Sequence, residues 1–245
     1  MSYYSGFKRW LFGPVVRLLL RPRLTGTERV PRTGGALVAG NHISGWDPIV
    51  IPAMLPRQMT FPAKAELFVA RGPLSRVVAW FVKAVGILPM DRSGGRASAS
   101  GMDVVVDALR EGQVVGIFPE GTRSPDDRLY RGRTGVARLA LATGVPVIPV
   151  GVRHTSPPGW RRAVVRFGEP LDFSAYAGAG NDRDVLRYVT DEVMAAIQEL
   201  SGQRYVDAYA TGVKQALRAG TGVDVVEVAR PGLGRTAPPL PEPRR

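Results

Sequence analysis

A histidine and an aspartate five residues apart, His42 and Asp47, are the residues in this sequence best suited by type and spacing to acid–base chemistry. They lie in the stretch GNHISGWD, residues 40–47, and His42 is one of only two histidines in the chain. A neutral imidazole can take up a proton near neutral pH, and a carboxylate that accepts its other ring N–H stabilises the imidazolium that forms. The chain has no cysteine and no G-x-S-x-G sequence, so no protein nucleophile is obvious. The pair therefore predicts a base that acts on a hydroxyl group of the substrate.

Two further stretches place glycine and arginine after predicted strands. One is GILPMDR, residues 86–92, and the other is FPEGTRS, residues 118–124. Planar guanidinium groups match phosphate bidentately, and glycine admits close approach of the backbone. Lys64 also follows a predicted strand and adds a point charge. The predicted phosphate-binding residues are Arg92, Glu120, Gly121, Thr122, Arg123 and Lys64.

Each of these residues also has a structural interpretation. The role of Asp47 could be limited to that of a carboxylate that starts a helix. Arg92 and Arg123 could be surface charges of an arginine-rich protein. Glu120 should repel phosphate, so it pairs with an arginine, binds a hydroxyl of the substrate or forms a structural ion pair. His154 has no neighbouring motif and is predicted to be structural or at the surface. The remaining basic residues near this loop favour a solvated surface, and the alternative is that they widen the anion site; they are Arg128, Arg131 and Arg133.

The elements that must position these residues alternate between strands and helices. The predicted strands are residues 36–39, 58–63, 85–90, 114–118, 145–150 and 163–167. The predicted helices are residues 67–83, broken at 71–73, then 102–109, 136–142, 185–200 and 205–217. This alternation predicts an α/β fold with a mostly parallel central sheet flanked by helices, and functional groups at the carboxyl ends of the strands.

The spacing of His42 and Asp47 also predicts their local structure. Within one regular helix, five positions would place the two side chains about 140° apart, poorly aimed at each other. We therefore expect a turn after the first strand, with Asp47 opening the next helix. Pro48 suits the first turn of that helix.

The two ends of the chain differ from its middle. Residues 1–25 form a basic, amphipathic stretch whose segment 7–20 is too short and too charged to span a bilayer, which favours a helix in the membrane interface. The alternative is a first helix packed on the core. Residues 231–245 are rich in proline and arginine and predict a disordered tail.

Composition sets further limits. The chain has 245 residues, which favours one large domain, and 33 Lys plus Arg against 21 Asp plus Glu give a formal charge of +12. This excess favours phosphate-bearing partners such as nucleic acid, an anionic membrane or a phosphorylated substrate. Zero cysteines exclude disulfides, and with two distant histidines no metal site is expected.

Four blocks occur in a fixed order: N-H-x-x-x-x-D, G-x-x-x-x-x-R, FPEGTRS and VPVIPV, residues 145–150. Because these blocks occur in the same order in the glycerolipid acyltransferases, the chain closely resembles that family, in particular the 1-acylglycerol-3-phosphate acyltransferases of phospholipid synthesis. The resemblance covers residues 41–150. It implies an acyltransferase domain over residues 26–220.

The resemblance also implies substrates and roles. The donor would be acyl-CoA or acyl carrier protein as cosubstrate, the acceptor lysophosphatidate (1-acylglycerol 3-phosphate), and the product phosphatidate, with no other cofactor. The base and its partner map onto His42 and Asp47. The glycerol phosphate contacts map onto Arg92, Glu120, Gly121, Thr122 and Arg123. A peripheral enzyme on the cytoplasmic face of an anionic membrane is expected, with no nucleic-acid partner.

Three questions stay open from the sequence. The acceptor could instead be glycerol 3-phosphate or another lysolipid. A non-catalytic protein that binds anionic membrane or nucleic acid is the other class of function, and it leaves the His42–Asp47 pair unexplained. The oxyanion donors are not identified, and backbone N–H groups near Gly40 or Gly45 are candidates.

Overall fold

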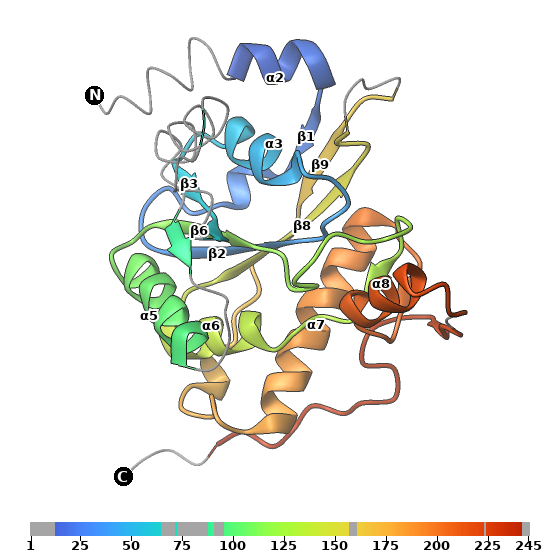
Figure 1. Ribbon diagram of the computed structural model, residues 1–245. Coiled ribbons are helices and arrows are strands. Elements are labelled where there is room, and N and C mark those ends of the chain that lie inside the picture. Colours follow the sequence, from blue (N-terminus) through green and yellow to red (C-terminus); the bar gives the residue numbers. More distant parts are fainter. Residues whose placement is uncertain are drawn as a thin grey trace.

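The computed structural model describes residues 13–64, 72, 88–90, 96–156, 161–222 and 224–241 of the chain. Within these residues, the main sheet has six strands in the order β1-β9-β8-β2-β6-β3 (Figure 1). Their bounds are Arg23–Thr25 for β1, Val164–Phe167 for β9, Val147–Arg153 for β8, Ala36–Gly40 for β2, Val114–Ile117 for β6 and Met59–Thr60 for β3. Neighbouring strands are parallel except β8 and β9, which are antiparallel. The mostly parallel sheet predicted from the sequence is confirmed.

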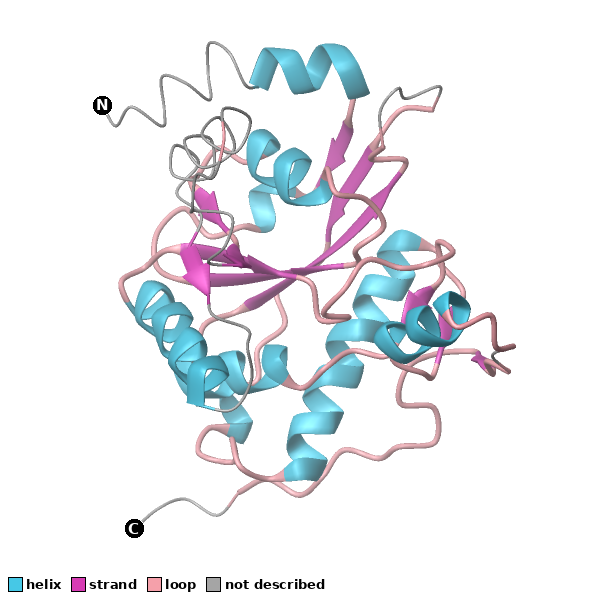
Figure 2. Ribbon diagram, viewed as in Figure 1, coloured by secondary structure: helices cyan, strands magenta, loops and turns pink. Residues whose placement is uncertain are grey.

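Helices cover both faces of this sheet (Figure 2). On one side lie α2 (Gly13–Leu20) and α3 (Asp47–Met54), and on the other lie α5 (Arg96–Arg110), α6 (Gly135–Thr143) and α7 (Arg183–Ser201). Two short 3₁₀ helices span Thr27–Arg29 and Ser174–Tyr176. The fold is thus a helix–sheet–helix sandwich.

Smaller elements complete the described structure. A parallel pair consists of β4 (Pro62–Lys64) and β5 (Leu88–Met90). A three-stranded sheet in the order β11-β10-β7 joins Glu227–Val228, Tyr205–Val206 and Leu129–Tyr130. Next to it in the chain comes α8 (Ala210–Arg218).

The alternating side chains of β2 divide between two apolar cores. Ala36 and Val38 belong to the core beneath α2 and α3, whereas Leu37 and Ala39 belong to the core beneath α5, α6 and α7. Every residue of β2 is buried. A strand covered on both faces needs apolar residues at every position, which explains the continuous apolar run in the sequence.

β2 also lies where the direction of strand order changes. The chain adds β3 and β6 on one side of β2 and then crosses to add β8 on the other side. In open α/β sheets, ligands bind beyond the carboxyl ends of the strands at such a point. The residues that follow Gly40 are therefore in the position where the fold offers a binding crevice.

The structure differs from the sequence-based expectations in two elements. The predicted helix over residues 205–217 begins only at Ala210, because the buried Tyr205 and Val206 pair with β7 and β11 as β10. The predicted strand over residues 58–63 divides into β3 and β4, which belong to different sheets. The expectations for residues 1–12, 67–83 and 85–87 fall almost entirely outside the described residues.

The C-terminal segment, for which composition predicts a disordered tail, contacts the domain at two places. Arg235 Nε lies 3.1 Å from the Asp191 carboxylate on α7, and the Tyr176 hydroxyl donates to the carbonyl of Pro238 over 3.1 Å. These contacts join residues that are far apart in the sequence.

None of the helices in the described part of the chain is both long enough and apolar enough to cross a bilayer.

Candidate functional site

The site begins where β2 ends, at a buried asparagine. Asn41 donates from Nδ2 to the carbonyl of Val152 over 2.9 Å and accepts at Oδ1 from the N–H of Val152 over 2.7 Å. The same Nδ2 donates to Gln203 Oε1 over 2.8 Å. These bonds join the end of β2 to β8 and to the residues after α7, so they fix the direction in which the following turn leaves the sheet.

His42 and Asp47 face each other across this turn. His42 Nδ1 lies 2.9 Å from Asp47 Oδ2, and Asp47 is the first residue of α3, with Pro48 next to it. The predicted turn and helix start are confirmed. Because the carboxylate accepts from Nδ1–H, the other ring nitrogen, Nε2, is left as the proton acceptor.

Asp47 is fully buried and surrounded by hydrogen-bond donors. Its Oδ2 also accepts from the N–H groups of Ile43 and Ser44, each over 2.8 Å, and its Oδ1 accepts from the hydroxyl of Thr155. A buried carboxylate is tolerated only when such donors replace water. Thr155 lies just beyond β8, and no sequence motif marks it as a partner of Asp47.

The His42 ring packs in an aromatic stack and keeps one edge open. It is stacked on Phe118 with 4.1 Å between ring centroids, and Phe118 is stacked on Phe61 with 5.1 Å between centroids. Its side chain is 17% exposed, whereas that of Asp47 is 0% exposed. The ring is therefore held rigidly but remains accessible to a substrate.

The loop after β6 holds the backbone of His42 on both sides. The His42 N–H donates to Glu120 Oε1 over 2.9 Å, and the His42 carbonyl accepts from the Ser124 N–H over 2.7 Å. The other oxygen of Glu120 accepts from the Tyr130 N–H over 3.0 Å. The FPEGTRS and NHxxxxD blocks are thus joined through their backbones.

Glu120 is buried, and its two carboxylate oxygens accept from these backbone groups. Burial raises its pKa to about 8, outweighing the two backbone hydrogen bonds, which lower it. Among the described residues, its hydrogen-bond partners are backbone N–H groups, not an arginine. This geometry favours a positioning role, and its contact with the substrate stays a prediction.

Exposed parts of the same loop face solvent beside the His42 turn. Gly121 has φ 74°, and a Cβ there would lie 2.9 Å from Arg133 Nε, so glycine suits both the backbone conformation and the close packing. Arg123 Nη1 lies 3.7 Å from the position of a Cβ on Gly45. The guanidinium group of Arg123 therefore lies close to the turn that carries His42.

A lysine from α8 joins this cluster, and the sequence did not indicate it. Lys214 Nζ lies 3.2 Å from Thr122 Oγ1. Burial lowers its pKa, and the nearby Arg123 and Arg218 lower it further, while Glu120 opposes them. A lysine in a helix ordinarily indicates a solvated surface, so only the packing of α8 against the loop shows this position.

The basic residues that were expected to form a solvated surface instead have partners. Arg128 pairs with Asp126 at 2.6 Å and with Glu227 at 3.1 Å. Arg131 and Arg133 both lie over the ring of Tyr209, and Arg133 Nη2 donates to Thr211 Oγ1 over 2.8 Å. These contacts attach the FPEGTRS region to the segment that leads into α8.

The remaining predicted phosphate-binding residues are less completely placed. Lys64 ends β4 and is the register partner of Met90 in β5, so its backbone is adjacent to the end of the second block. Its side chain and the whole of Arg92 are outside the described part of the structure.

Comparison with known proteins agrees with the four blocks. The family model described as Acyltransferase matches residues 21–153, more than half of the chain. A protein of Borreliella burgdorferi named 1-acyl-sn-glycerol-3-phosphate acyltransferase is 30% identical over 149 residues, which are 60% of this chain and 54% of that protein. A protein of Bacillus subtilis with the same name is 29% identical over 182 residues, covering 72% of this chain and 86% of that one. This chain thus spans about half the length of the first relative and most of the second.

A solved structure shares the fold. The crystal structure of the 1-acyl-sn-glycerophosphate (LPA) acyltransferase PlsC from Thermotoga maritima matches with a TM-score of 0.61 and 24% identity, over 80% of this chain and 78% of that one. The family match includes the His42 turn, the FPEGTRS loop and β8. By its sequence and its fold, this chain belongs to the acyltransferase family.

Proposed function

We propose that the protein transfers a fatty acyl group from a thioester donor, acyl-CoA or acyl carrier protein, to the free hydroxyl of 1-acylglycerol 3-phosphate, giving phosphatidate. The observation that carries this proposal is the 2.9 Å contact between His42 and a buried Asp47, close to Arg123 of the FPEGTRS loop, whose Thr122 lies 3.2 Å from Lys214 of α8. The names of the relatives support the choice of acceptor.

His42 is the proposed general base. Nε2 would take the proton of the acceptor hydroxyl as that oxygen attacks the thioester carbonyl carbon. Asp47 would stabilise the imidazolium through the Nδ1–H bond. When the tetrahedral intermediate collapses, the C–S bond breaks and the leaving thiolate takes the proton from the imidazolium, so the enzyme returns to its starting state.

The acceptor phosphate would bind at Thr122, Arg123 and Lys214. Burial lowers the pKa of Lys214, and repulsion by the nearby Arg123 lowers it further; Lys214 Nζ lies 3.2 Å from Thr122 Oγ1. A phosphate would relieve this repulsion and accept charge-assisted hydrogen bonds. Lys64, which ends β4, and Arg92, which lies outside the described residues, remain proposed contributors.

The oxyanion of the tetrahedral intermediate needs a donor, and we assign this role to Gly45. Its N–H is not a donor in any backbone hydrogen bond of the described residues, and it lies in the turn between His42 and Asp47. A free backbone N–H held in a rigid turn stabilises developing negative charge without reorganisation.

Membrane attachment is part of the proposal, because both lipids of the reaction reside in a bilayer. On α2, Leu18 and Leu19 are 76% and 49% exposed, next to the exposed Arg17. Exposed leucines beside arginine suit insertion into the interface of an anionic membrane.

The direct test is acyl transfer by a His42→Ala variant. With 1-acylglycerol 3-phosphate and a labelled acyl thioester, release of free thiol should fall by at least about 10³-fold, near the upper range for loss of a general base. The melting temperature should stay close to that of the wild type, because the ring is partly exposed. Retained turnover in a folded variant would refute the proposal. Glycerol 3-phosphate and other lysolipids, assayed side by side, test the choice of acceptor.

A further inference from the structure

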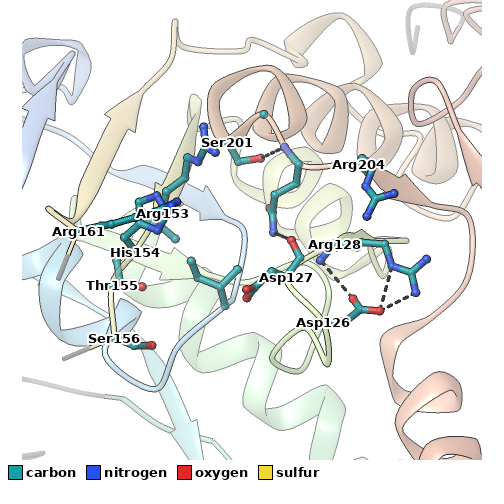
Figure 3. A pocket seen from close by; sticks show the side chains of 14 residues that line it. Asp126, Asp127, Arg128, Arg153, His154, Thr155, Ser156, Arg161, Ser201 and Arg204 are labelled. Carbon is teal, nitrogen blue, oxygen red and sulfur yellow. Dashed lines mark hydrogen bonds and ion pairs between the residues drawn. The ribbon is translucent and has the colours of Figure 1, made fainter. Parts of the chain in front are cut away.

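A pocket of about 630 Å³ lies at the carboxyl end of β8 (Figure 3). Its walls come from the residues after β8, the residues after α7 and the loop at residues 126–128. The side chains that matter for its chemistry are Ile43, Asp127, Arg153, His154, Arg161 and Arg204. None of the four blocks assigns a role to this pocket, and its histidine, His154, was expected to be structural or at the surface.

One wall of the pocket is hydrogen-bonded directly to the His42 turn, residues 42–47. Thr155, which lines the pocket, donates to the Asp47 carboxylate, and Ser156, its neighbour, donates to the Ser44 hydroxyl over 3.0 Å. Ile43, next to His42, lines the pocket as well. A molecule in this pocket is therefore adjacent to the residues that hold the proposed base.

The pocket is separate from the proposed phosphate contacts, although one loop contributes to both. The FPEGTRS stretch at residues 118–124 follows β6, and residues 126–128 of the same loop form one wall of the pocket. Thr122, Arg123 and Lys214, the proposed contacts of the acceptor phosphate, do not line the pocket. An acceptor bound through these residues therefore leaves the pocket open to the donor.

The charges of the pocket favour an anion. Among the described residues, Arg153 and Arg161 form no ion pair, whereas the carboxylate of Asp126 is already bonded to Arg128 and to the Tyr130 hydroxyl. Arg204 pairs with Glu227 at 3.2 Å. Asp127 is the remaining carboxylate of the lining. The guanidinium groups of Arg153 and Arg161 thus outnumber it, and the pocket has an excess of positive charge.

The imidazole of His154 is affected by the same excess of positive charge. Burial lowers its pKa, and Arg153 and Arg161 lower it further, against a smaller opposite effect of Asp127. Its backbone has φ 56°, an unusual conformation for a residue other than glycine. In Figure 3 the side chains of Arg153, His154 and Arg161 gather at the same end of the pocket.

We propose that this pocket binds the phosphate of the acyl donor's phosphopantetheine arm, with Arg153 and Arg161 as its ligands. The inference rests on the proposed function, since it assumes a thioester donor. Coenzyme A and acyl carrier protein share this arm, and the thioester is at the end of the arm away from the phosphate. With the phosphate bound beside Thr155, the arm would extend along the His42 turn toward His42.

The test is a double variant, Arg153→Gln with Arg161→Gln, assayed with three donors. The KM for acyl-CoA or acyl carrier protein, whichever the wild type uses, should rise by roughly tenfold for each lost charge-assisted hydrogen bond. The KM for acyl-pantetheine, which lacks the phosphate, and the KM for the acceptor should not change. Calorimetric binding of coenzyme A should weaken, with pantetheine as the phosphate-free comparison.

Arg162→Gln is the matched control, because Arg162 is exposed and does not line the pocket. Equal loss with acyl-pantetheine, an unchanged KM for every donor, or a raised acceptor KM would overturn the assignment. If the double variant unfolds, Arg161→Gln alone gives the same comparison. No turnover by the wild type with any donor would instead refute the proposed function.

Discussion

The orientation of His42 depends on side chains from separate segments of the chain. Asp47 fixes its Nδ1, Phe118 supports its ring, and Glu120 holds its backbone N–H. A base that is held in place by several rigid contacts needs little reorganisation when the reaction begins. The position of the proposed general base therefore depends on the residues around His42 as much as on the histidine itself.

Replacement of Lys214 should raise the KM only for an acceptor that carries a phosphate. Changing Lys214 to Met removes the cation beside Thr122, and a charge-assisted hydrogen bond is worth about 1.5–3 kcal/mol, so KM for 1-acylglycerol 3-phosphate should rise about 10- to 100-fold. Steady-state kinetics with a monoacylglycerol, which has no phosphate, should show no change. Gln215→Met, at the exposed neighbour on α8, is the control for effects on the helix. An equal effect on both acceptors would contradict phosphate binding by Lys214.

Glu120 should make the protein less stable as pH rises. The unfolded chain loses this proton near the ordinary glutamate pKa of 4.5, whereas burial raises the pKa in the folded protein to about 8. The folded state then binds more protons over this interval, so its free energy of unfolding falls as pH increases. In Glu120→Gln this contribution is absent, and urea unfolding at pH 5 and pH 8 should show a smaller difference than in the wild type. The exposed Glu199→Gln should behave like the wild type; an unchanged difference in Glu120→Gln would be evidence against this titration.

Among the elements, β8 and α7 depend on very close packing. A Cβ on Gly151 would lie 2.5 Å from backbone atoms of Leu200 and Ser201, so the strand and the end of the helix meet without room for a methyl group. This contact sets the position of residues 201–204, which form one wall of the pocket. This close contact explains why a glycine occupies the middle of an otherwise apolar strand.

Gly151→Ala should destabilise the fold by about 1–3 kcal/mol, the usual cost of forcing an extra methyl group into a packed core. Denaturant unfolding measures the loss. Gly135→Ala at the start of α6 is the matched control, since nothing lies within 4 Å of its Cβ position, and it should be neutral or slightly stabilising. If both variants had the same stability, the close contact between β8 and α7 would not limit this site.

In the whole molecule, α2 and α3 lie on the same side of the main sheet (Figure 1), and α2 carries exposed leucines beside the exposed Arg17. Val16 and Leu20 pack into the core below α2, while Leu18 and Leu19 point away from it. Trp46, in the His42 turn just before α3, is 36% exposed. A membrane bound on this side would bring the acceptor lipid close to the turn that carries His42.

Leu18→Ser with Leu19→Ser should weaken binding to anionic vesicles. Each buried leucine contributes about 1.5–3 kcal/mol, so flotation with phosphatidylglycerol vesicles should show at least about a tenfold lower partition coefficient. Leu217→Ser removes an exposed leucine from α8 and should have no effect. Undiminished flotation of the double variant would remove α2 from the account of membrane attachment.

Features confined to short stretches were predictable from the sequence. The turn from His42 to Asp47, the helix that starts at Asp47 and the parallel core strands follow from local motifs and apolar periodicity. The family match also includes the blocks in which these features lie. Local geometry and side-chain type are enough here, because each feature is encoded within about ten residues.

The partners of these residues could be identified only in the folded chain. Thr155 reaches Asp47, Lys214 reaches Thr122, and Arg235 reaches Asp191 across long separations in sequence. Such contacts depend on how sheet and helices pack, and no local pattern specifies that packing. The sequence thus indicates the proposed base and the FPEGTRS loop, whereas the three-dimensional packing determines what holds them and adds a pocket at the carboxyl end of β8.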